Sequence, residues 1–320
     1  MNLHSDQDAF RALLSAISGK TKIREDIIEK DYYITLLLSE LALWQKELPA
    51  YFKGGTAVYK AIGSLKRFSE DIDLTVEVND CSKSMGKKRL EAAANAYTAL
   101  SRTKDKAKES NTKGSITSVY EYQPVTVIDA DDALQRFGHV KVEATSFTVS
   151  EPVEALIIEP LLYSEASVDQ QAILYSQYEV FPFSIMTIRM ERIFADKIFA
   201  AEFYYQRKMM FDVAKHLYDL AIMTKTERIS ALFNRRDEFI KMLQYKRREE
   251  LSRIGSDLAE KSFKDFQFFK AFDSDVVLQN AFREMQRVYV FNDADIISFE
   301  EGVREINKIH KVLLTLEFGR

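Results

Sequence analysis

The feature that most constrains the fold of this chain is a pair of adjacent glycines followed by two spaced aspartates. Gly54 and Gly55 form the first part, and Asp71 and Asp73 lie within residues 70–76, which predict a strand. Side chains two positions apart in a strand project from the same face, so the two carboxylates would lie side by side. Mg²⁺ takes oxygen ligands and is commonly shared between one or two carboxylates and substrate phosphates. The sequence therefore predicts a site for a metal and a triphosphate.

The two glycines and the threonine after them are predicted to bind phosphate. Gly54 and Gly55 can adopt a positive φ or let a phosphate approach the backbone closely. Thr56 is placed to cap the helix that residues 57–62 predict, and the N–H groups at a helix start attract anions. We therefore expect Gly54, Gly55 and Thr56 to hold the β- and γ-phosphates of a nucleotide. Glycine pairs also occur in many ordinary turns, and it is the acidic strand downstream that distinguishes this one.

Arg67 and Ser69 are further candidates because they directly precede the acidic strand. In that position a guanidinium and a hydroxyl would steady phosphate or ribose. A salt bridge within the loop and a hydroxyl-bonded turn are the structural alternatives.

Glu143 is the candidate third carboxylate. It alternates with Lys141 at the start of a strand predicted over residues 140–149, so both side chains are expected on one face. Glu143 would complete the metal shell or act as the base that activates an attacking hydroxyl. The alternative is an exposed strand residue paired with Lys141.

Lys197 and Asp219 are charged residues in largely apolar helical segments. No acid lies three or four residues from Lys197, so an intrahelical ion pair does not account for it. Its ammonium must therefore reach solvent or meet an anion. A carboxylate in an apolar helix likewise needs a partner, which for Asp219 would be Lys197 or the nucleotide.

Composition excludes several classes of protein. A chain of 320 residues with 46% hydrophobic content can bury a full core and is expected to hold two domains. No apolar run approaches the roughly 20 residues that span a bilayer, and the amino terminus lacks the order of a signal peptide. We therefore expect a cytoplasmic protein without a membrane partner. Because Cys81 is the single cysteine and the four histidines are scattered, any metal is expected to be oxygen-bound.

The net charge of −4 conceals a segregation of charge along the chain. Residues 81–113 hold nine basic and three acidic side chains, whereas residues 114–180 hold two basic and eleven acidic ones. A polyanion responds to local potential rather than to total charge, so basic segments beside an acidic metal site suit RNA or nucleotide binding. Solvated helix faces are the alternative.

A further basic group surrounds Tyr245, and its cations beside an aromatic ring would suit contact with an RNA backbone. Its members are Arg235, Arg236, Lys246, Arg247, Arg248 and Arg253. A solvated helix is again the alternative.

Local patterns divide the chain into a mixed first part and a helical second part. The first fifty residues predict helices, residues 87–107 predict a polar helix, and residues 109–117 predict a loop. Strands are predicted over residues 119–128 and 140–149, with a turn at residues 129–132 between them. After Pro182, long amphipathic stretches predict helices to the end of the chain.

Taken together, these motifs resemble the AbiEii/AbiGii-type nucleotidyltransferase toxins, which are part of the polymerase-β-like nucleotidyltransferase superfamily. The resemblance spans most of the chain and rests on five segments in order: residues 29–32, 54–56, 67–74, 191–197 and 215–220. It implies an α+β fold, in which a nucleotidyltransferase-type mixed β-sheet domain with flanking helices covers residues 1–182. A helical domain over residues 183–320 would complete the active-site cleft.

The resemblance also implies an activity. Relatives of this kind are toxins of toxin–antitoxin or phage-defence pairs, and they transfer a nucleotide from an NTP to an RNA acceptor by Mg²⁺-dependent catalysis. By this likeness Asp71 and Asp73 would bind the metal, Lys197 would neutralise the triphosphate, and Asp219 would belong to the site. The leading acceptor is tRNA, and the implied partner is a cognate antitoxin protein. Transfer to a protein acceptor and a non-catalytic nucleotide-binding module are the alternatives.

Overall fold

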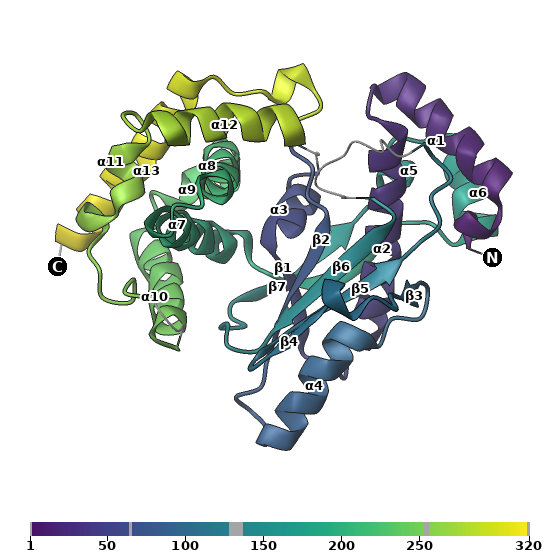
Figure 1. The fold of residues 1–320 in the computed structure, drawn as a ribbon, viewed down its shortest axis with the longest axis horizontal. Coiled ribbons are helices and arrows are strands. Elements are labelled where there is room, and N and C mark those ends of the chain that lie inside the picture. The colour runs from purple at the N-terminus through teal and green to yellow at the C-terminus, as the bar shows by residue number, and fades with distance from the viewer. Residues whose placement is uncertain (1, 64–65, 128–136, 253–255, 319–320) are drawn as a thin grey trace. The chain divides into compact units, whose positions relative to one another are not determined.

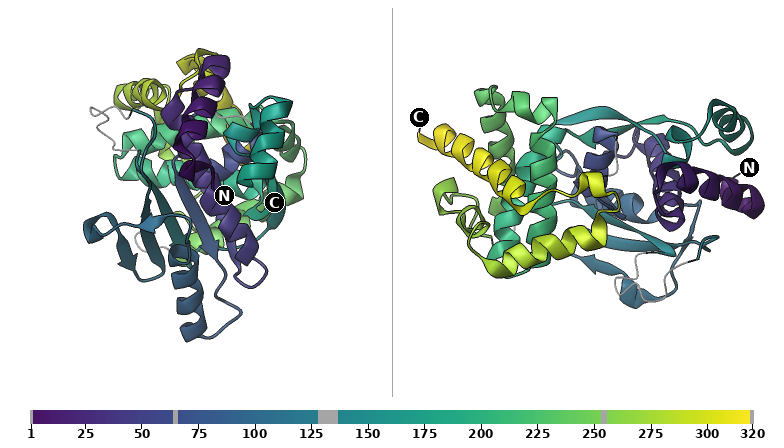
Figure 2. Two further views of the ribbon diagram at one scale, coloured as in Figure 1. Left: turned by 90° about the vertical axis from the view of Figure 1, so that its right-hand side faces the viewer. Right: turned by 90° about the horizontal axis from the view of Figure 1, so that it is seen from above.

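The computed structural model describes residues 2–63, 66–127, 137–252 and 256–318. The chain divides into two compact units, Met1–Thr187 (unit 1) and Ile188–Arg320 (unit 2), which Figures 1 and 2 colour from purple to teal and from green to yellow. The boundary predicted from the sequence, after residue 182, lies slightly earlier. Among the described residues, no helix is long and apolar enough to cross a membrane.

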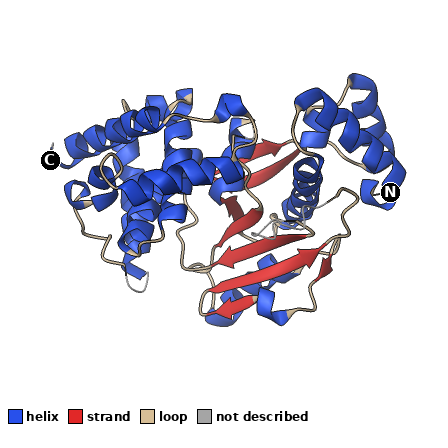
Figure 3. Cartoon of the chain, turned by 45° about the horizontal axis from the view of Figure 1, so that its top comes forward, coloured by secondary structure: helices blue, strands red, loops and turns tan. Residues whose placement is uncertain are grey.

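Unit 1 is built on one mixed sheet, whose described strands follow the order β3-β5-β6-β2-β1-β8-β7, with β4 paired to β5. Strand β2 is antiparallel to β1 and parallel to β6, and β8 is parallel to β1. Figure 3 shows the strands in red, side by side in this sheet. Their bounds are β1 Ala50–Lys53, β2 Asp71–Val76, β3 Ser101–Arg102, β4 Ser110–Thr112, β5 Ser115–Glu121, β6 His139–Thr145, β7 Val153–Ile158 and β8 Phe183–Ile188.

One face of the sheet is apolar and covered by helices. Ile72 and Leu74 of β2 and Val142 of β6 are fully buried there, and α2 and α4 pack against both strands. The hydrophobic burial of this face stabilises unit 1 and leaves the opposite face of β2 and β6 for polar side chains. The helices of unit 1 are α1 Gln7–Thr21, α2 Glu25–Trp44, α3 Gly54–Ile62, α4 Lys83–Asn95, α5 Leu161–Ser164 and α6 Val168–Tyr178, with 3-10 turns at Leu3–Ser5 and Lys106–Lys108.

Unit 2 is helical throughout its described residues after β8. Helices α7 and α8 pack against each other through fully buried side chains such as Phe194, Ile198 and Leu217. Helices α10 and α11 pack on α7, and α12 and α13 pack on α8. Their bounds are α7 Met190–Gln206, α8 Met210–Thr224, α9 Glu227–Leu232, α10 Arg236–Ser252, α11 Gln267–Ala271, α12 Val276–Tyr289 and α13 Phe299–Phe318, with 3-10 turns at Phe263–Asp265 and Asp293–Asp295. The α+β fold class and the helices of the first fifty residues are therefore confirmed.

The polar helix predicted over residues 87–107 is wrong in its second half, because α4 ends at Asn95. The chain leaves the helix where the Tyr97 ring packs against Trp44 and Tyr120, with each pair of centroids 5.3 Å apart. The loop predicted over residues 109–117 is also wrong in part. Strands β4 and β5 form a hairpin there, and Gly114 adopts φ +84° between them, a conformation that glycine accepts readily.

The strand predicted over residues 119–128 is β5, which starts earlier and ends at Glu121. Past this point the backbone N–H groups of Val125 and Thr126 donate to the Glu29 carboxylate rather than to a strand. The turn predicted at residues 129–132 lies outside the described residues.

The start of the helical part is corrected as well. Residues 183–188 form strand β8, with Thr187 opposite Phe52 of β1, so the helices begin at Met190. The β-branched residues of this short segment favour a strand over a helix.

Candidate functional site

The acidic pair lies on the polar face of the sheet, at the start of β2. Asp71 and Asp73 are partly exposed and alternate with the buried Ile72 and Leu74, which confirms the predicted strand and the shared face of the two carboxylates. On the parallel neighbour β6, Glu143 lies directly opposite Asp73. The register of the sheet therefore brings the third candidate carboxylate beside the pair.

Lys53 completes a row of charged residues across three strands. It lies opposite Asp73 on the antiparallel strand β1, so Lys53, Asp73 and Glu143 follow one another across β1, β2 and β6. Its ammonium donates to Thr145 Oγ1 at 3.3 Å. Lys53 was not among the candidates from the sequence, although it directly precedes the double glycine. Only the strand register reveals that it neighbours the acidic pair.

The carboxylates of Asp71 and Glu143 are not neutralised by any of the described residues. Among the described residues, neither carboxylate has a hydrogen bond or an ion pair. Both Glu143 and Lys141 are exposed, and they do not pair with each other, so this structural alternative is not realised. A negative charge left without a protein cation favours the approach of an external cation.

Gly54 is the residue that allows β1 to turn into helix α3 directly against Asp73. Its φ is +81°, and a Cβ atom added there would lie 2.0 Å from Asp73 Oδ2, far inside van der Waals contact. The site therefore requires glycine for two separate reasons, the left-handed backbone and the close approach of the carboxylate. Helix α3 begins at this glycine, and Lys53, its N-cap residue, makes no side-chain cap. The first N–H groups of a helix have no intrahelical acceptor and attract anions.

Gly55 and Thr56 connect the helix start to the loop before β2. A Cβ atom at Gly55 would lie 2.8 Å from Ser69 Oγ and 3.0 Å from Arg67 Nη2, so both predicted polar residues lie against this glycine. The Thr56 hydroxyl donates to the carbonyl of Asp71 at 2.7 Å and lies 3.0 Å from Ser69 Oγ. The prediction that Thr56 caps the helix is wrong, because α3 begins two residues earlier and this hydroxyl is directed across to β2.

Arg67 is held in one orientation by its surroundings. The side chain is buried, its Nη1 donates to the carbonyl of Phe68 at 3.0 Å, and its guanidinium lies 5.4 Å from the centroid of the Tyr59 ring. A buried guanidinium fixed in this way is pre-organised for an anion near Gly55.

The donor set fits a magnesium ion that is shared with a substrate. The described residues contain no group of three or more His, Cys, Asp or Glu side chains that could hold a metal ion. Asp71 and Asp73 would therefore offer a metal ion two carboxylates, and Glu143 does not complete a three-acid cluster with them. Mg²⁺ held by one or two carboxylates takes its remaining ligands from water and substrate phosphates.

A pocket of about 180 Å³ adjoins the same loop on unit 1, with Thr56 and Ser69 in its wall. A buried ion pair lies there: Lys60 Nζ is 2.6 Å from Asp31 Oδ1, and Asp31 Oδ2 accepts from the N–H of Leu161 at 2.8 Å. Neither charged residue was assigned a role from the sequence. Each lies in a largely apolar helix, which is the same signal that singled out Lys197 and Asp219.

Glu29 and Lys30 of α2 tie parts of unit 1 together. Burial raises the pKa of Glu29, although its carboxylate accepts from Thr126 and from two backbone N–H groups. The Lys30 ammonium donates to the carbonyl of His139. Burial, with the positive charges of Lys30, Lys141 and Lys108, lowers the pKa of His139 to about 4. This histidine is therefore neutral at physiological pH.

Lys197 and Asp219 meet each other inside unit 2. Lys197 Nζ lies 2.5 Å from Asp219 Oδ2, and the two side chains are 5% and 0% exposed. The helices α7 and α8 that carry them are in extensive contact. Lys197 is thus one of the two partners that the sequence analysis gave for Asp219. Whether either residue also serves the nucleotide stays a prediction.

Most of the basic group around Tyr245 supports the fold of unit 2. Lys246 is buried between the Glu249 and Glu250 carboxylates, and Arg247 donates to three backbone carbonyls beyond α10. Arg235 pairs with Glu238, and Arg236 donates to the carbonyl of Leu316. Arg253 lies outside the described residues. Of the predicted group, Arg248 is the cation that stays exposed beside Tyr245.

Comparisons with known proteins agree with the motifs. The model of a family described as "Nucleotidyl transferase AbiEii toxin, Type IV TA system" matches residues 36–305. No curated protein sequence matches the chain. Among solved structures, one similar chain is MenT4, a nucleotidyltransferase toxin from Mycobacterium tuberculosis H37Rv. It shares 15% sequence identity over 96% of this chain and 98% of its own, with a TM-score of 0.46.

Proposed function

Because the chain belongs to the AbiEii family of nucleotidyltransferase toxins of type IV toxin–antitoxin systems, we propose that it transfers a nucleotide from an NTP to an RNA acceptor. The reaction would depend on Mg²⁺, and tRNA is the first acceptor to test. One observation carries this proposal. The carboxylates of Asp71 and Asp73 share a face of β2 next to Gly54, where the uncapped start of α3 approaches so closely that only glycine fits.

Each group of this arrangement has a chemical task in the proposed reaction. Asp71 and Asp73 would hold the metal, which when bound neutralises charge on the triphosphate. The N–H groups at the start of α3 would bind the β- and γ-phosphates, since they lack intrahelical acceptors. The hydroxyl of Ser69 and the guanidinium of Arg67 lie against Gly55, where they would orient phosphate or ribose.

Glu143 is the proposed general base. An RNA hydroxyl oxygen forms a bond to the α-phosphorus, the bond from that phosphorus to the bridging oxygen breaks, and pyrophosphate leaves. The proton of the hydroxyl passes to the Glu143 carboxylate, which lies opposite Asp73 and has no partner among the described residues. A free carboxylate can accept this proton without first breaking an ion pair.

Labelled nucleotides test the proposal directly. The protein is incubated with each α-labelled NTP, Mg²⁺ and total tRNA, beside Asp71→Asn and Lys141→Gln variants. We expect one or more NTPs to label RNA with the wild type and the Lys141→Gln control, and no labelling with Asp71→Asn. If the folded wild type labels no RNA with any NTP, the proposal of an RNA acceptor is wrong.

The same assay separates the alternatives. Label on a polypeptide from a cell extract would favour a protein acceptor over RNA. If expression of wild type and Asp73→Ala slows growth equally, the toxicity does not depend on the proposed chemistry, and a non-catalytic nucleotide-binding module becomes the better description. An antitoxin is expected as the partner that relieves this toxicity, and the protein is expected in the cytoplasm.

A further inference from the structure

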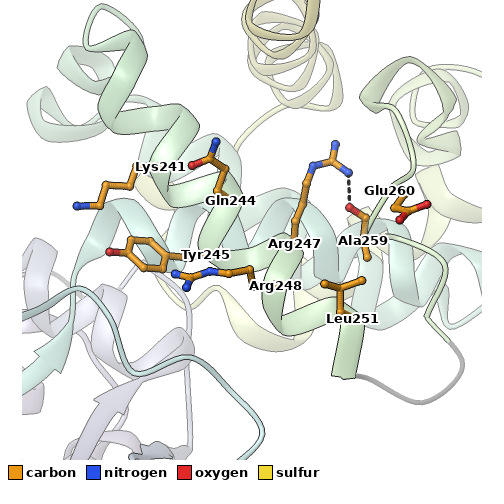
Figure 4. A pocket seen from close by; sticks show the side chains of 8 residues that line it. All are labelled: Lys241, Gln244, Tyr245, Arg247, Arg248, Leu251, Ala259 and Glu260. Atoms are coloured by element: carbon orange, nitrogen blue, oxygen red, sulfur yellow. Dashed lines mark hydrogen bonds between the residues drawn. The ribbon is translucent and has the colours of Figure 1, made fainter. Parts of the chain in front are cut away.

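One face of helix α10 in unit 2 forms the wall of a pocket of about 520 Å³. Figure 4 shows that Lys241, Tyr245 and Arg248 lie together on one side of the helix, whereas Arg247 is directed at the carbonyl of Ala259. The spacing of three to four residues explains the shared face. The other residues that line the pocket are Gln244, Leu251 and Glu260.

Two cations approach the same tyrosine ring. The guanidinium carbon of Arg248 lies 4.8 Å from the centroid of the Tyr245 ring, and Lys241 Nζ lies 5.8 Å from it. Both distances are within the range of a cation–π interaction. Tyr245 is only 8% exposed, whereas both cations are exposed. The ring is therefore a largely buried platform beside which two exposed cations lie.

The part of the chain that the structure describes does not neutralise these two charges. Among the described residues, neither Lys241 nor Arg248 has an ion pair. Three of the four acids of α10 are engaged elsewhere: Glu238 pairs with Arg189 and Arg235, Glu249 with Arg192 and Lys246, and Glu250 with Lys246.

This arrangement concentrates positive charge beside one ring and therefore suits an anion. Two like charges repel each other, and each gains at an exposed site only about 0.5–1 kcal/mol from the ring. A stripe of basic side chains that serves only solubility does not require a shared aromatic platform. Two adjacent phosphates would neutralise both cations at once.

We propose that Lys241 and Arg248 bind the sugar-phosphate backbone of the RNA acceptor, with Tyr245 as the positioning residue beneath them. The identity of the ligand as RNA rests on the proposed function. A single nucleotide needs an enclosed site that reads its base, whereas this pocket presents its cations on an open helix face. Neighbouring phosphates of one chain suit such a face, because successive basic contacts along a backbone add up.

The test measures RNA binding apart from catalysis. Fluorescence anisotropy is recorded with labelled single-stranded RNA and with total tRNA as competitor, in buffer with chelator so that no transfer occurs. The Lys241→Gln/Arg248→Gln variant removes the two cations. A Lys264→Gln/Lys270→Gln variant is the control, since it removes two exposed charges from unit 2 outside the pocket.

We expect the Lys241→Gln/Arg248→Gln variant to bind RNA about tenfold more weakly at low salt. The slope of log K against log salt should fall by about 0.7 for each lost contact to a single strand. The control should bind as the wild type does, and in the transfer assay the KM for RNA should rise by the same factor as the Kd. Tyr245→Phe should keep the affinity, and Tyr245→Leu should lower it without loss of either charge.

Several results would overturn the inference. Equal RNA affinity of the wild type and Lys241→Gln/Arg248→Gln does so while leaving the transferase proposal intact, provided that the wild type still labels RNA. An equal loss of RNA affinity in the Lys264→Gln/Lys270→Gln control would also overturn the inference, because the overall positive charge would then explain binding. Competition by free NTP or by a polypeptide, but not by tRNA, would assign the pocket to another ligand. If the wild type labels no RNA but its RNA binding still depends on Lys241 and Arg248, the proposal of an RNA acceptor fails, and the pocket binds RNA that is not the acceptor.

Discussion

Two acids on strands β2 and β6 of unit 1 and two acids on helices of unit 2 have opposite surroundings. Asp71 and Glu143 are accessible to solvent and have no partner among the described residues. Asp219 and Glu202 in unit 2 are fully buried, and each meets a lysine, Lys197 and Lys261 respectively. The first pair is available to an external cation or proton, whereas each carboxylate of the second pair already contacts a lysine of the protein.

Burial and the presence of a protein cation separate structural carboxylates from those that are free to react. A buried carboxylate with its cation is costly to separate, because the remaining charge is left in an apolar surrounding. An accessible carboxylate without a cation contributes little to stability and stays available to a ligand. The same substitution should therefore affect activity in unit 1 and stability in unit 2.

The largest expected effect is on the chemistry of unit 1. Asp71→Asn should lower nucleotide transfer by about 10³-fold or more, because a metal contributes several kcal/mol to a charged transition state and each 1.36 kcal/mol is about tenfold in rate. Its unfolding free energy should stay within about 0.5 kcal/mol of the wild type. Transfer assays and urea unfolding measure the two quantities. A large loss of stability would break the comparison, since Asp71 would then be a structural residue.

The matched experiment in unit 2 is Lys197→Met, which leaves Asp219 buried without its cation. We expect a loss of about 3–5 kcal/mol in the unfolding free energy. The Lys197→Met/Asp219→Leu variant should recover much of it, because no unpaired charge remains. Chemical denaturation of the three proteins measures this. If the double variant is as stable as the wild type but transfers no nucleotide, the pair serves the reaction as well as the fold.

Gly54→Ala should lower both the transfer activity and the free energy of unfolding, each by less than in the two experiments above. A left-handed backbone costs a residue with a Cβ about 1–2 kcal/mol, and here the Cβ would also displace the Asp73 carboxylate. Gly63→Ala is the matched control, because Gly63 has φ +70° with no atom within 4 Å of its added Cβ. Thermal denaturation should show that both variants are less stable than the wild type. Only Gly54→Ala should lose nucleotide transfer activity. Equal transfer by the two would show that Asp73 tolerates displacement.

The smallest effect concerns an ion pair of unit 1 that resembles those of unit 2. Arg102 and Lys106 donate to Glu109 and lower its pKa to about 2. The pairing stabilises the folded state at neutral pH, and this contribution is lost as the pH falls from about 4.5 towards 2. Glu109→Gln should be slightly less stable than the wild type near pH 7 and equally stable at the acid end. Urea unfolding midpoints of the wild type and Glu109→Gln, recorded from neutral to acid pH, measure the difference in stability. A difference that does not change with pH would exclude the ion pair as its cause.

The strand that carries the acidic pair could be predicted because its pattern is local. Alternation of Asp71 and Asp73 with apolar residues determines which face each side chain takes, whatever the rest of the chain does. The apolar helices around Lys197 and Asp219 signalled buried charges for a similar reason. The same reasoning would have singled out Asp31 and Lys60, which also lie in apolar helices and pair with each other.

Errors arose where distant contacts decide the local structure. Thr56 was expected to cap a helix, but its hydroxyl donates to the carbonyl of Asp71, fifteen residues away. The helix expected up to residue 107 ends at Asn95, and just beyond its end the Tyr97 ring packs against Trp44 and Tyr120. Residues 183–188 pair with β1, more than a hundred residues earlier, and so form a strand. A local pattern contains no information about such partners.

The sequence by itself determined the type of site: two carboxylates on one strand face, a glycine turn before them, and charged residues hidden in apolar helices. The packing of the chain determines which charges are neutralised by a protein partner and which have none among the described residues. In the folded chain, Lys53 and Glu143 lie on either side of Asp73. Lys197 pairs with Asp219, and Lys241 and Arg248 both lie beside the Tyr245 ring. The physical reason is that pairing and burial depend on distances between residues remote in the chain, and these distances are properties of the packed fold.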